Sequence, residues 1–200
     1  MGQKQETRDV IIEAAYGCLA HYGPSRTSVE DVAQAAGVSR ATMYRYFPGG
    51  RDELINDVVA WEFHRFFVRL YEAVRDAETL EEVIERGLFV AHRAIKEHEV
   101  LQMVLRTEPE ALDVVLESEV ASTRVQISEF LLPYLERHEL APGVEPGEAA
   151  GFLSRMVLSY IGAQGSWDLS NPEEVSRLVR AELLAGIVPR EPRTLTLRQI

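Results

Sequence analysis

Apolar positions recur along the chain with a helical period. Between positions 10 and 19 they follow an i, i+3, i+4 spacing, and Gly23 and Pro24 then end this segment near Tyr22. Comparable patterns cover residues 27–37, 39–47, 51–76, 80–97, 100–106, 110–139, 147–165 and 171–187. No stretch of useful length alternates with the period of two that a β-strand needs. The pattern therefore predicts an all-α protein of about nine helices.

Capping residues predict where several of these helices begin. Thr27 followed by Glu30 has the spacing of a capping box, so we expect Thr27 to cap the second helix, which would end at Gly37. Ser39 is expected to cap the third helix, and Asn171 the last. A compact unit of three helices thus precedes a long fourth helix.

Charge is unevenly distributed along the chain. The protein has 21 Lys and Arg against 32 Asp and Glu, which gives a net charge of −11. The first 56 residues carry six basic and seven acidic side chains, so most of the acidic excess lies in the remainder. From Val32 to Arg51 there is no carboxylate, whereas Arg40, Arg45 and Arg51 are present. An acid-free window with arginines is typical of a surface that meets nucleic-acid phosphates, while the acidic remainder should avoid nucleic acid and anionic membranes.

The third helix has two different faces. At about 100° per residue, Met43, Tyr46 and Phe47 share one side, whereas Tyr44 and Arg45 point the other way. The first side can anchor the helix to an apolar core, and the second is free to contact a partner. Two short helices of this kind, joined by a tight turn, predict a helix-turn-helix whose second helix enters the major groove of DNA.

Other classes of protein find little support in the sequence. Cys18 is the only cysteine, so no internal disulfide is possible, and we expect a cytoplasmic location and a buried thiol. Neither a leader nor a membrane anchor is expected. The five histidines lack metal-ligand spacing, and we expect His64 and His92 to be ordinary surface or core residues. With no catalytic motif, an enzyme is weakly supported, and no cofactor or metal is expected.

The stretch TSVEDVAQAAGVSRATMYRYFPGGRDEL, residues 27–54, resembles the DNA-binding domain of the TetR family of bacterial transcriptional regulators. Its apolar, Ala, Gly, Ser and aromatic positions all fall in register. The resemblance implies a helix-turn-helix domain over residues 1–52 and a helical effector-binding and dimerisation domain over residues 53–187. Residues 188–200 contain two prolines and little periodicity, so we expect a loosely held tail there. Members commonly have a shorter link and a lysine at the start of the fourth helix, where this chain has FPGGRDEL.

The resemblance also implies which residues bind DNA. They lie at the start of the second helix, along the third helix, and at the position of the usual lysine: Thr27, Ser28, Ser39, Arg40, Ala41, Thr42, Tyr44, Arg45, Tyr46 and Arg51. The guanidinium of Arg45 can fork to O6 and N7 of a guanine, and the methyl group of Ala41 can contact a thymine methyl. The hydroxyls of the set can reach phosphates or bases. Alternatively, Arg40 and Arg45 are solvated surface charges and Tyr46 belongs to the core.

A small apolar or aromatic effector and a homodimer are further implications of the resemblance. The effector-pocket candidates are aromatic and apolar residues of the middle helices: Trp61, Phe63, Phe66, Phe67, Tyr71, Phe89, His92, Met103 and Phe130. The dimer-interface candidates recur at helical spacing in the last two helices: Phe152, Met156, Tyr160, Val175, Leu178, Val179 and Leu183. Residues of both sets are also typical of a plain helical core.

The function that follows is that of a sequence-specific regulator of transcription that binds double-stranded DNA. In detail, we expect a ligand-relieved homodimeric repressor of a palindromic operator, without a membrane partner. The alternative is a helical small-molecule-binding or interaction protein that does not bind an operator.

Overall fold

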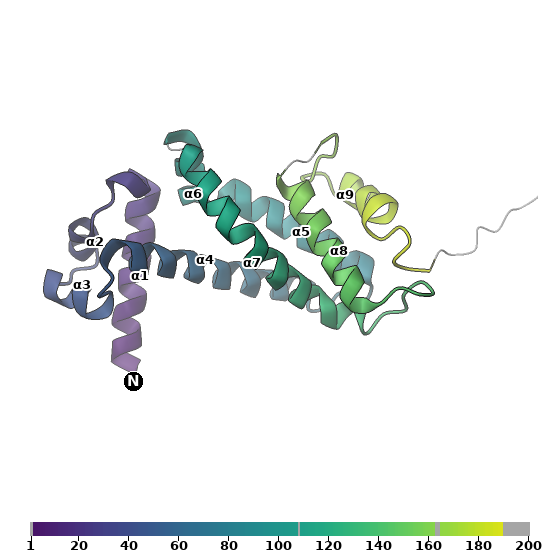
Figure 1. Cartoon of the computed structure of the whole chain (residues 1–200), viewed down its shortest axis with the longest axis horizontal. Coiled ribbons are helices and arrows are strands. Elements are labelled where there is room, and N and C mark those ends of the chain that lie inside the picture. Colours follow the sequence, from purple (N-terminus) through teal and green to yellow (C-terminus); the bar gives the residue numbers. More distant parts are fainter. Residues whose placement is uncertain (1, 108, 163–164, 190–200) are drawn as a thin grey trace, which may run out of the picture. The chain divides into compact units, whose positions relative to one another are not determined.

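The computed structural model describes residues 2–107, 109–162 and 165–189. Within these ranges the chain forms nine α-helices, drawn in Figure 1. They are α1 (Gly2–Tyr22), α2 (Val29–Ala35), α3 (Arg40–Tyr46), α4 (Gly50–Val74), α5 (Leu80–Glu97), α6 (Glu99–Thr107), α7 (Pro109–Leu135), α8 (Pro146–Gly162) and α9 (Pro172–Leu178). A short 3₁₀ turn, η1 (Pro24–Arg26), precedes α2, and a π-helical segment, η2 (Val179–Leu183), continues α9. The prediction of an all-α fold is confirmed.

Backbone contacts divide the chain into two compact units. The first joins Met1–Glu72 to Arg93–Ser118, and the second joins Ala73–His92 to Glu119–Ile200. The functional boundary predicted after residue 52 stays a prediction, since compactness groups α6 with the N-terminal helices. The tail predicted for residues 188–200 lies outside the described residues from position 190 onward.

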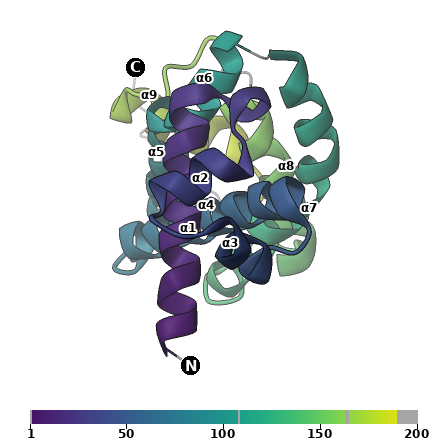
Figure 2. The ribbon, with the colours of Figure 1, turned by 90° about the vertical axis from the view of Figure 1, so that its left-hand side faces the viewer.

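The first unit is built around the packing of α1 on α2 and α6, and of α2 on α3. Figure 2 shows α1 beside α2 and α3. Apolar side chains from α1, from α2, from α3 and its C-cap, and from the first half of α4 form one buried cluster: Ile11, Ile12, Ala15, Cys18, Leu19, Val29, Val32, Ala33, Met43, Phe47, Leu54 and Val58. The burial of Cys18 confirms that its thiol is part of the core.

The second unit has its own buried apolar residues on α5, α7, α8 and α9. Polar contacts also join α9 and η2 to α5, because Ser176 donates a hydrogen bond to Glu85 and Arg180 Nη1 lies 2.7 Å from Glu81 Oε1. Asn171 caps α9 as predicted, since its side chain accepts a hydrogen bond from the Glu173 N–H.

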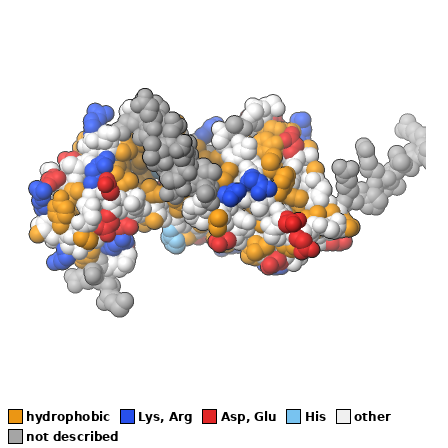
Figure 3. Space-filling view, viewed as in Figure 1, with side chains coloured by type: hydrophobic (Ala, Val, Ile, Leu, Met, Phe, Trp, Pro, Cys, Tyr) orange, Lys and Arg blue, Asp and Glu red, His pale blue; other side chains and the backbone are white. Residues whose placement is uncertain are grey.

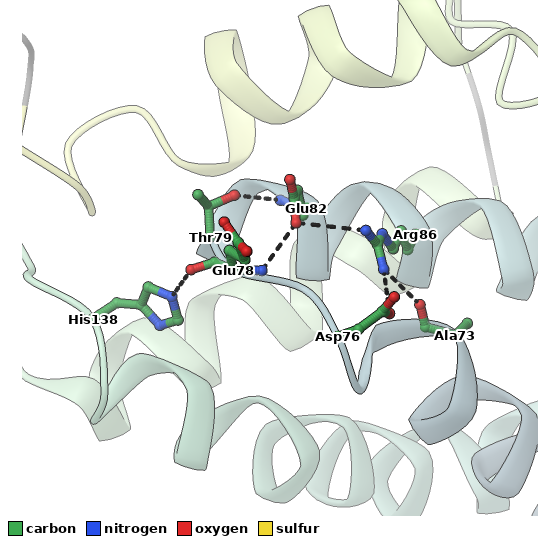
Figure 4. Close-up of polar contacts among 7 residues, drawn as sticks. All are labelled: Ala73, Asp76, Glu78, Thr79, Glu82, Arg86 and His138. Atoms are coloured by element: carbon green, nitrogen blue, oxygen red, sulfur yellow. Dashed lines mark hydrogen bonds and ion pairs between the residues drawn. The ribbon is translucent and has the colours of Figure 1, made fainter.

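A network of polar contacts defines the start of α5 (Figure 4). Thr79 Oγ1 accepts from the Glu82 N–H at 3.1 Å, and Glu82 Oε2 accepts from the Glu78 N–H at 3.0 Å. The first bond satisfies an N–H at the start of the helix that has no partner inside it, and the second ties Glu82 to the residue before the cap. Arg86 donates to Asp76 at 2.7 Å and thereby holds the pKa of the Asp76 carboxyl below its usual range. The first turn of α5 is therefore tied to the residues just before it.

Candidate nucleic-acid interface

Local capping sets the register of α3. Ser39 Oγ accepts a hydrogen bond from the Thr42 N–H at 3.1 Å, so the helix begins at Arg40 as predicted. Met43 and Phe47 are each 1% exposed and hold the inner face of the helix in the core. Tyr44 is 40% exposed on the opposite face, where Arg45 is exposed as well. The two faces predicted for this helix are confirmed.

The N-cap of α2 corrects a prediction by one residue. Ser28, not Thr27, caps the helix: its Oγ accepts from the Asp31 N–H at 3.2 Å, and the Asp31 carboxylate accepts from the Ser28 N–H at 3.0 Å. The hydrogen bond from the Ser28 side chain is the main cause that lowers the pKa of Asp31. Both the Thr27/Glu30 and the Ser28/Asp31 pairs have capping-box spacing, but the Thr27 hydroxyl is buried and donates to Gly23 O at 2.8 Å.

Arg51 connects the start of α4 to the turn before α2. Its Nε donates to Thr27 O at 3.1 Å, and its Nη2 donates to the carbonyl of Pro24. Its Nη1 also lies 3.6 Å from Asp52 Oδ1. The guanidinium thus satisfies carbonyl groups of the η1 turn. The sequence predicted only a phosphate contact for Arg51 and not this role.

Two arginines lie on the exposed surface of α3. Arg40 Nη1 is 2.8 Å from Glu30 Oε1 of α2, and its guanidinium carbon lies 5.6 Å from the centroid of the Tyr44 ring. The guanidinium of Arg45 lies over the Tyr46 ring at 5.3 Å. Because the Arg40–Glu30 pair is exposed, it is weak enough for Arg40 to exchange a carboxylate for a phosphate.

Arg26 is a basic residue that sequence reasoning passed over. It ends η1, is exposed, and directly precedes the buried Thr27 and the cap Ser28. It stands outside every helical pattern, which is why periodicity did not select it. Its position next to a helix N-terminus could have identified it from the sequence, because the backbone N–H groups there also attract anions.

Most of the predicted DNA-binding residues share the surface of α2 and α3 or its margin. Thr27 is buried, whereas the others are exposed or partly exposed: Ser28, Ser39, Arg40, Ala41, Thr42, Tyr44, Arg45, Tyr46 and Arg51. In the space-filling view, basic side chains lie on this unit among apolar and acidic ones (Figure 3). Their contacts with DNA stay predictions.

The effector-pocket candidates fall in both compact units, and their lining of a pocket stays a prediction. Trp61 packs against the core of the first unit and contacts the Tyr16 ring at 5.9 Å between centroids. Phe66 and Phe67 contact each other at 5.3 Å. The others range from buried to exposed: Phe63, Tyr71, Phe89, His92, Met103 and Phe130.

The dimer-interface candidates of α9 and η2 are buried in the single chain. Val175, Leu178, Val179 and Leu183 are 0–2% exposed and fill its core, and their place in an interface stays a prediction. Their helical spacing described an apolar face correctly, but that face is covered within the same chain. The candidates of α8 retain surface: Phe152 is 37% exposed, while Met156 and Tyr160 are partly exposed.

Among the residues that the structure describes, His, Cys, Asp and Glu side chains form no group of three that could hold a metal ion. None of the helices described is both long and apolar enough to cross a lipid bilayer.

α2 packs on α3 across a short turn, and α3 is anchored by Met43 and Phe47 while its other face is exposed, which is the arrangement of a helix-turn-helix. Residues 11–58, which reach from α1 into α4, match the family described as "Bacterial regulatory proteins, tetR family". The chain therefore carries the N-terminal domain of the TetR family, as its resemblance to that family predicted.

Individual relatives extend this comparison. The HTH-type transcriptional repressor KstR2 of Mycobacterium tuberculosis is 29% identical over 107 residues, 52% of this chain and 51% of that protein. The chain spans 42–53% of the length of the curated relatives that are 27–29% identical. The crystal structure of a TetR-family regulator from Pectobacterium atrosepticum shares the fold with a TM-score of 0.68 and 19% identity, covering 96% of this chain and 99% of that one.

A second solved structure is more similar in sequence. It was described as "Molecular basis for control of antibiotic production by a bacterial hormones", and it is 26% identical with a TM-score of 0.59. The match covers 91% of this chain and 97% of the other. The likeness in fold thus extends well beyond residues 11–58.

Proposed function

We propose that this protein is a sequence-specific DNA-binding regulator of transcription, a homodimeric repressor that a small apolar or aromatic ligand releases from a palindromic operator. The observation that carries the proposal is α3. Ser39 caps this helix, Met43 and Phe47 anchor it, and its outer face presents Ala41, Tyr44 and Arg45.

The proposed contacts with DNA are of two chemical kinds, contacts with bases and contacts with phosphates. Arg45 has no carboxylate partner among the described residues, so its planar guanidinium is available to the two acceptors of a guanine in the major groove. Arg26 and Arg40 are exposed cations beside the helix N-termini and suit phosphates, which fix register without reading sequence.

Repression and its relief have separate support. The matched relative KstR2 is a repressor, and the second solved structure is described as concerning control of antibiotic production by bacterial hormones. In this chain, a ligand that favours one of two conformers would lower DNA affinity by the difference in its affinity for the two states. The aromatic residues of α4, among them Phe66 and Phe67, make an apolar ligand the best match.

Selection from random DNA duplexes by the purified protein tests the proposal. At about 0.15 M salt, the wild type should enrich a palindromic sequence. Arg45→Ala should cost about 1–3 kcal/mol and relax one position of each half-site, because it removes a bidentate base contact. Arg124→Ala removes the same charge from an exposed site on α7 and serves as the matched control.

The possible outcomes separate the alternatives. Equal losses on every duplex for Arg45→Ala would remove its base-reading role. An absence of enrichment at any salt concentration would favour the helical small-molecule-binding or interaction protein. A reporter gene that falls silent when the protein is deleted would argue against repression.

A further inference from the structure

His98 lies where three helices of the first unit meet. Its Nδ1 accepts a hydrogen bond from the Leu101 N–H at 3.1 Å, so the imidazole caps the first turn of α6. Its Nε2 lies 3.4 Å from Glu62 Oε2 of α4. The Tyr16 ring of α1 packs edge-on against the imidazole with 6.0 Å between centroids. One side chain therefore contacts α1, α4 and α6.

These contacts select one protonation state of the ring. A nitrogen that accepts from an N–H carries no proton, so the neutral ring has its proton on Nε2, directed at Glu62. Protonation would set an Nδ1–H against the Leu101 N–H and abolish the cap. Burial lowers the pKa of His98 and outweighs the Glu62 carboxylate, which raises it. The folded chain therefore favours the neutral imidazole of His98.

The charged and titratable groups around His98 come from all three helices. The charged groups are Glu62, Arg65 and Arg69 of α4 and Glu99 of α6, and α1 contributes the titratable phenol of Tyr16. The Glu62 carboxylate is shared with Arg65, whose Nη1 lies 3.2 Å from Glu62 Oε1, and this reduces its attraction for an imidazolium. Burial, with Glu62 and Glu99, raises the pKa of Tyr16, so the phenol stays neutral. At the end of α5, Glu97 pairs with Arg93 instead.

The position of α6 bears directly on the helix-turn-helix. α6 packs on α1, and Val100 of α6 packs against the buried cluster that anchors α2 and α3. α1 supplies five members of that cluster, from Ile11 to Leu19. Releasing the start of α6 therefore loosens the packing on α1, and α1 supplies much of the core beneath α3.

We propose that His98 is a positioning residue for DNA binding: its neutral ring fastens α6 to α1 and α4, and its protonation loosens α6 and weakens operator binding. This regulation rests on the proposed function. Acidification otherwise adds positive charge and tightens DNA binding, so the effect has the opposite sign to the general electrostatic one.

The same contacts give the fold a pH dependence of defined sign. The unfolded chain protonates His98 near its ordinary pKa of about 6.5, and the folded chain protonates it only at lower pH. The stabilising contribution is therefore complete above about pH 6.5 and is lost as the pH falls through the folded pKa.

The test compares the full-length wild type with His98→Asn at pH 7.5 and 5.5. Asparagine is a strong N-cap that keeps an acceptor for α6 but does not titrate. His64→Asn, at an exposed site on α4, removes a titrating group elsewhere. Operator affinity of the wild type and His64→Asn should fall about fivefold at pH 5.5, as expected when a helix cap is lost. The affinity of His98→Asn should hold or rise.

Unfolding temperatures of the same proteins supply a readout that needs no DNA. The drop between pH 7.5 and 5.5 should be smaller for His98→Asn than for the other two. Equal pH dependence of all three proteins in both measurements would overturn the proposal. If no protein binds a duplex at pH 7.5, the proposed function and its regulation fail together, while the unfolding temperatures still decide whether His98 fastens α6.

Discussion

The guanidinium of Arg51 faces two backbone carbonyls, those of Pro24 and Thr27, that lie 27 and 24 residues earlier in the chain. Carbonyls in a turn before a helix need donors, and a planar guanidinium can serve two of them at once. Since Ser28 follows directly, Arg51 helps to fix where α2 begins. At this scale the residue is part of the framework of the interface as well as a cation near it.

Substitution of Arg51 separates these two roles. Arg51→Ala should lower the free energy of unfolding by about 1–3 kcal/mol, because it leaves two carbonyls without their charged donor, and should weaken binding to all duplexes alike. Arg51→Lys keeps the charge but cannot bridge both carbonyls in the same way.

Urea unfolding and DNA titration of both variants provide the measurement. If lysine restores DNA affinity and neither variant changes unfolding, Arg51 acts through phosphate alone, and the framework role is wrong. If lysine restores neither property, the contacts with Pro24 and Thr27 are the important ones.

At the scale of elements, α9 and η2 form a single buried strip. The helix widens after Leu178, where the Leu184 N–H reaches Val179 O at 2.8 Å, five residues back. This wider turn keeps Val179 and Leu183 inward, and both are fully buried. The strip therefore contributes to the stability of the chain itself.

Leu178→Ala should reduce the free energy of unfolding by about 2–5 kcal/mol, because it leaves a cavity in a fully buried site. Glu173→Ala, at an exposed position in the first turn of the same helix, should change it by about 0.5 kcal/mol or less. Chemical denaturation measures both. A Leu178 variant as stable as the control would mean that this face is covered by something other than the chain's own core.

At the scale of the whole molecule, the proposed homodimer needs an apolar surface that survives folding. On the last helices, α8 provides one through Phe152, with Met156 and Tyr160 partly exposed nearby. Aromatic residues of this kind often dominate an interface.

Phe152→Asp should weaken dimerisation by about thirtyfold or more, the effect of losing an interface residue worth about 2 kcal/mol. Val125→Asp is the control, since Val125 is 51% exposed on α7. Sedimentation equilibrium gives the association constant, and circular dichroism verifies the fold. Unchanged association of a folded Phe152 variant would exclude this part of α8 from the interface.

The sequence by itself determined the helices, the caps at Ser39 and Asn171, and the two faces of α3. These features depend on residues one to four positions apart, which local spacing describes well. Even at this range Thr27 and Ser28 both had capping-box spacing, and only the fold decided between them: the buried Thr27 hydroxyl points to the Gly23 carbonyl, while Ser28 Oγ accepts from the Asp31 N–H.

Only the tertiary structure decided what covers each apolar face and which partner each polar group finds. Periodicity identified the stripe from Val175 to Leu183 but not that the chain itself buries it. The contact of Arg51 with Thr27 and that of His98 with Glu62 join residues far apart in the chain. Such pairings are set by how helices pack, and helical spacing carries no information about the neighbour on the other side.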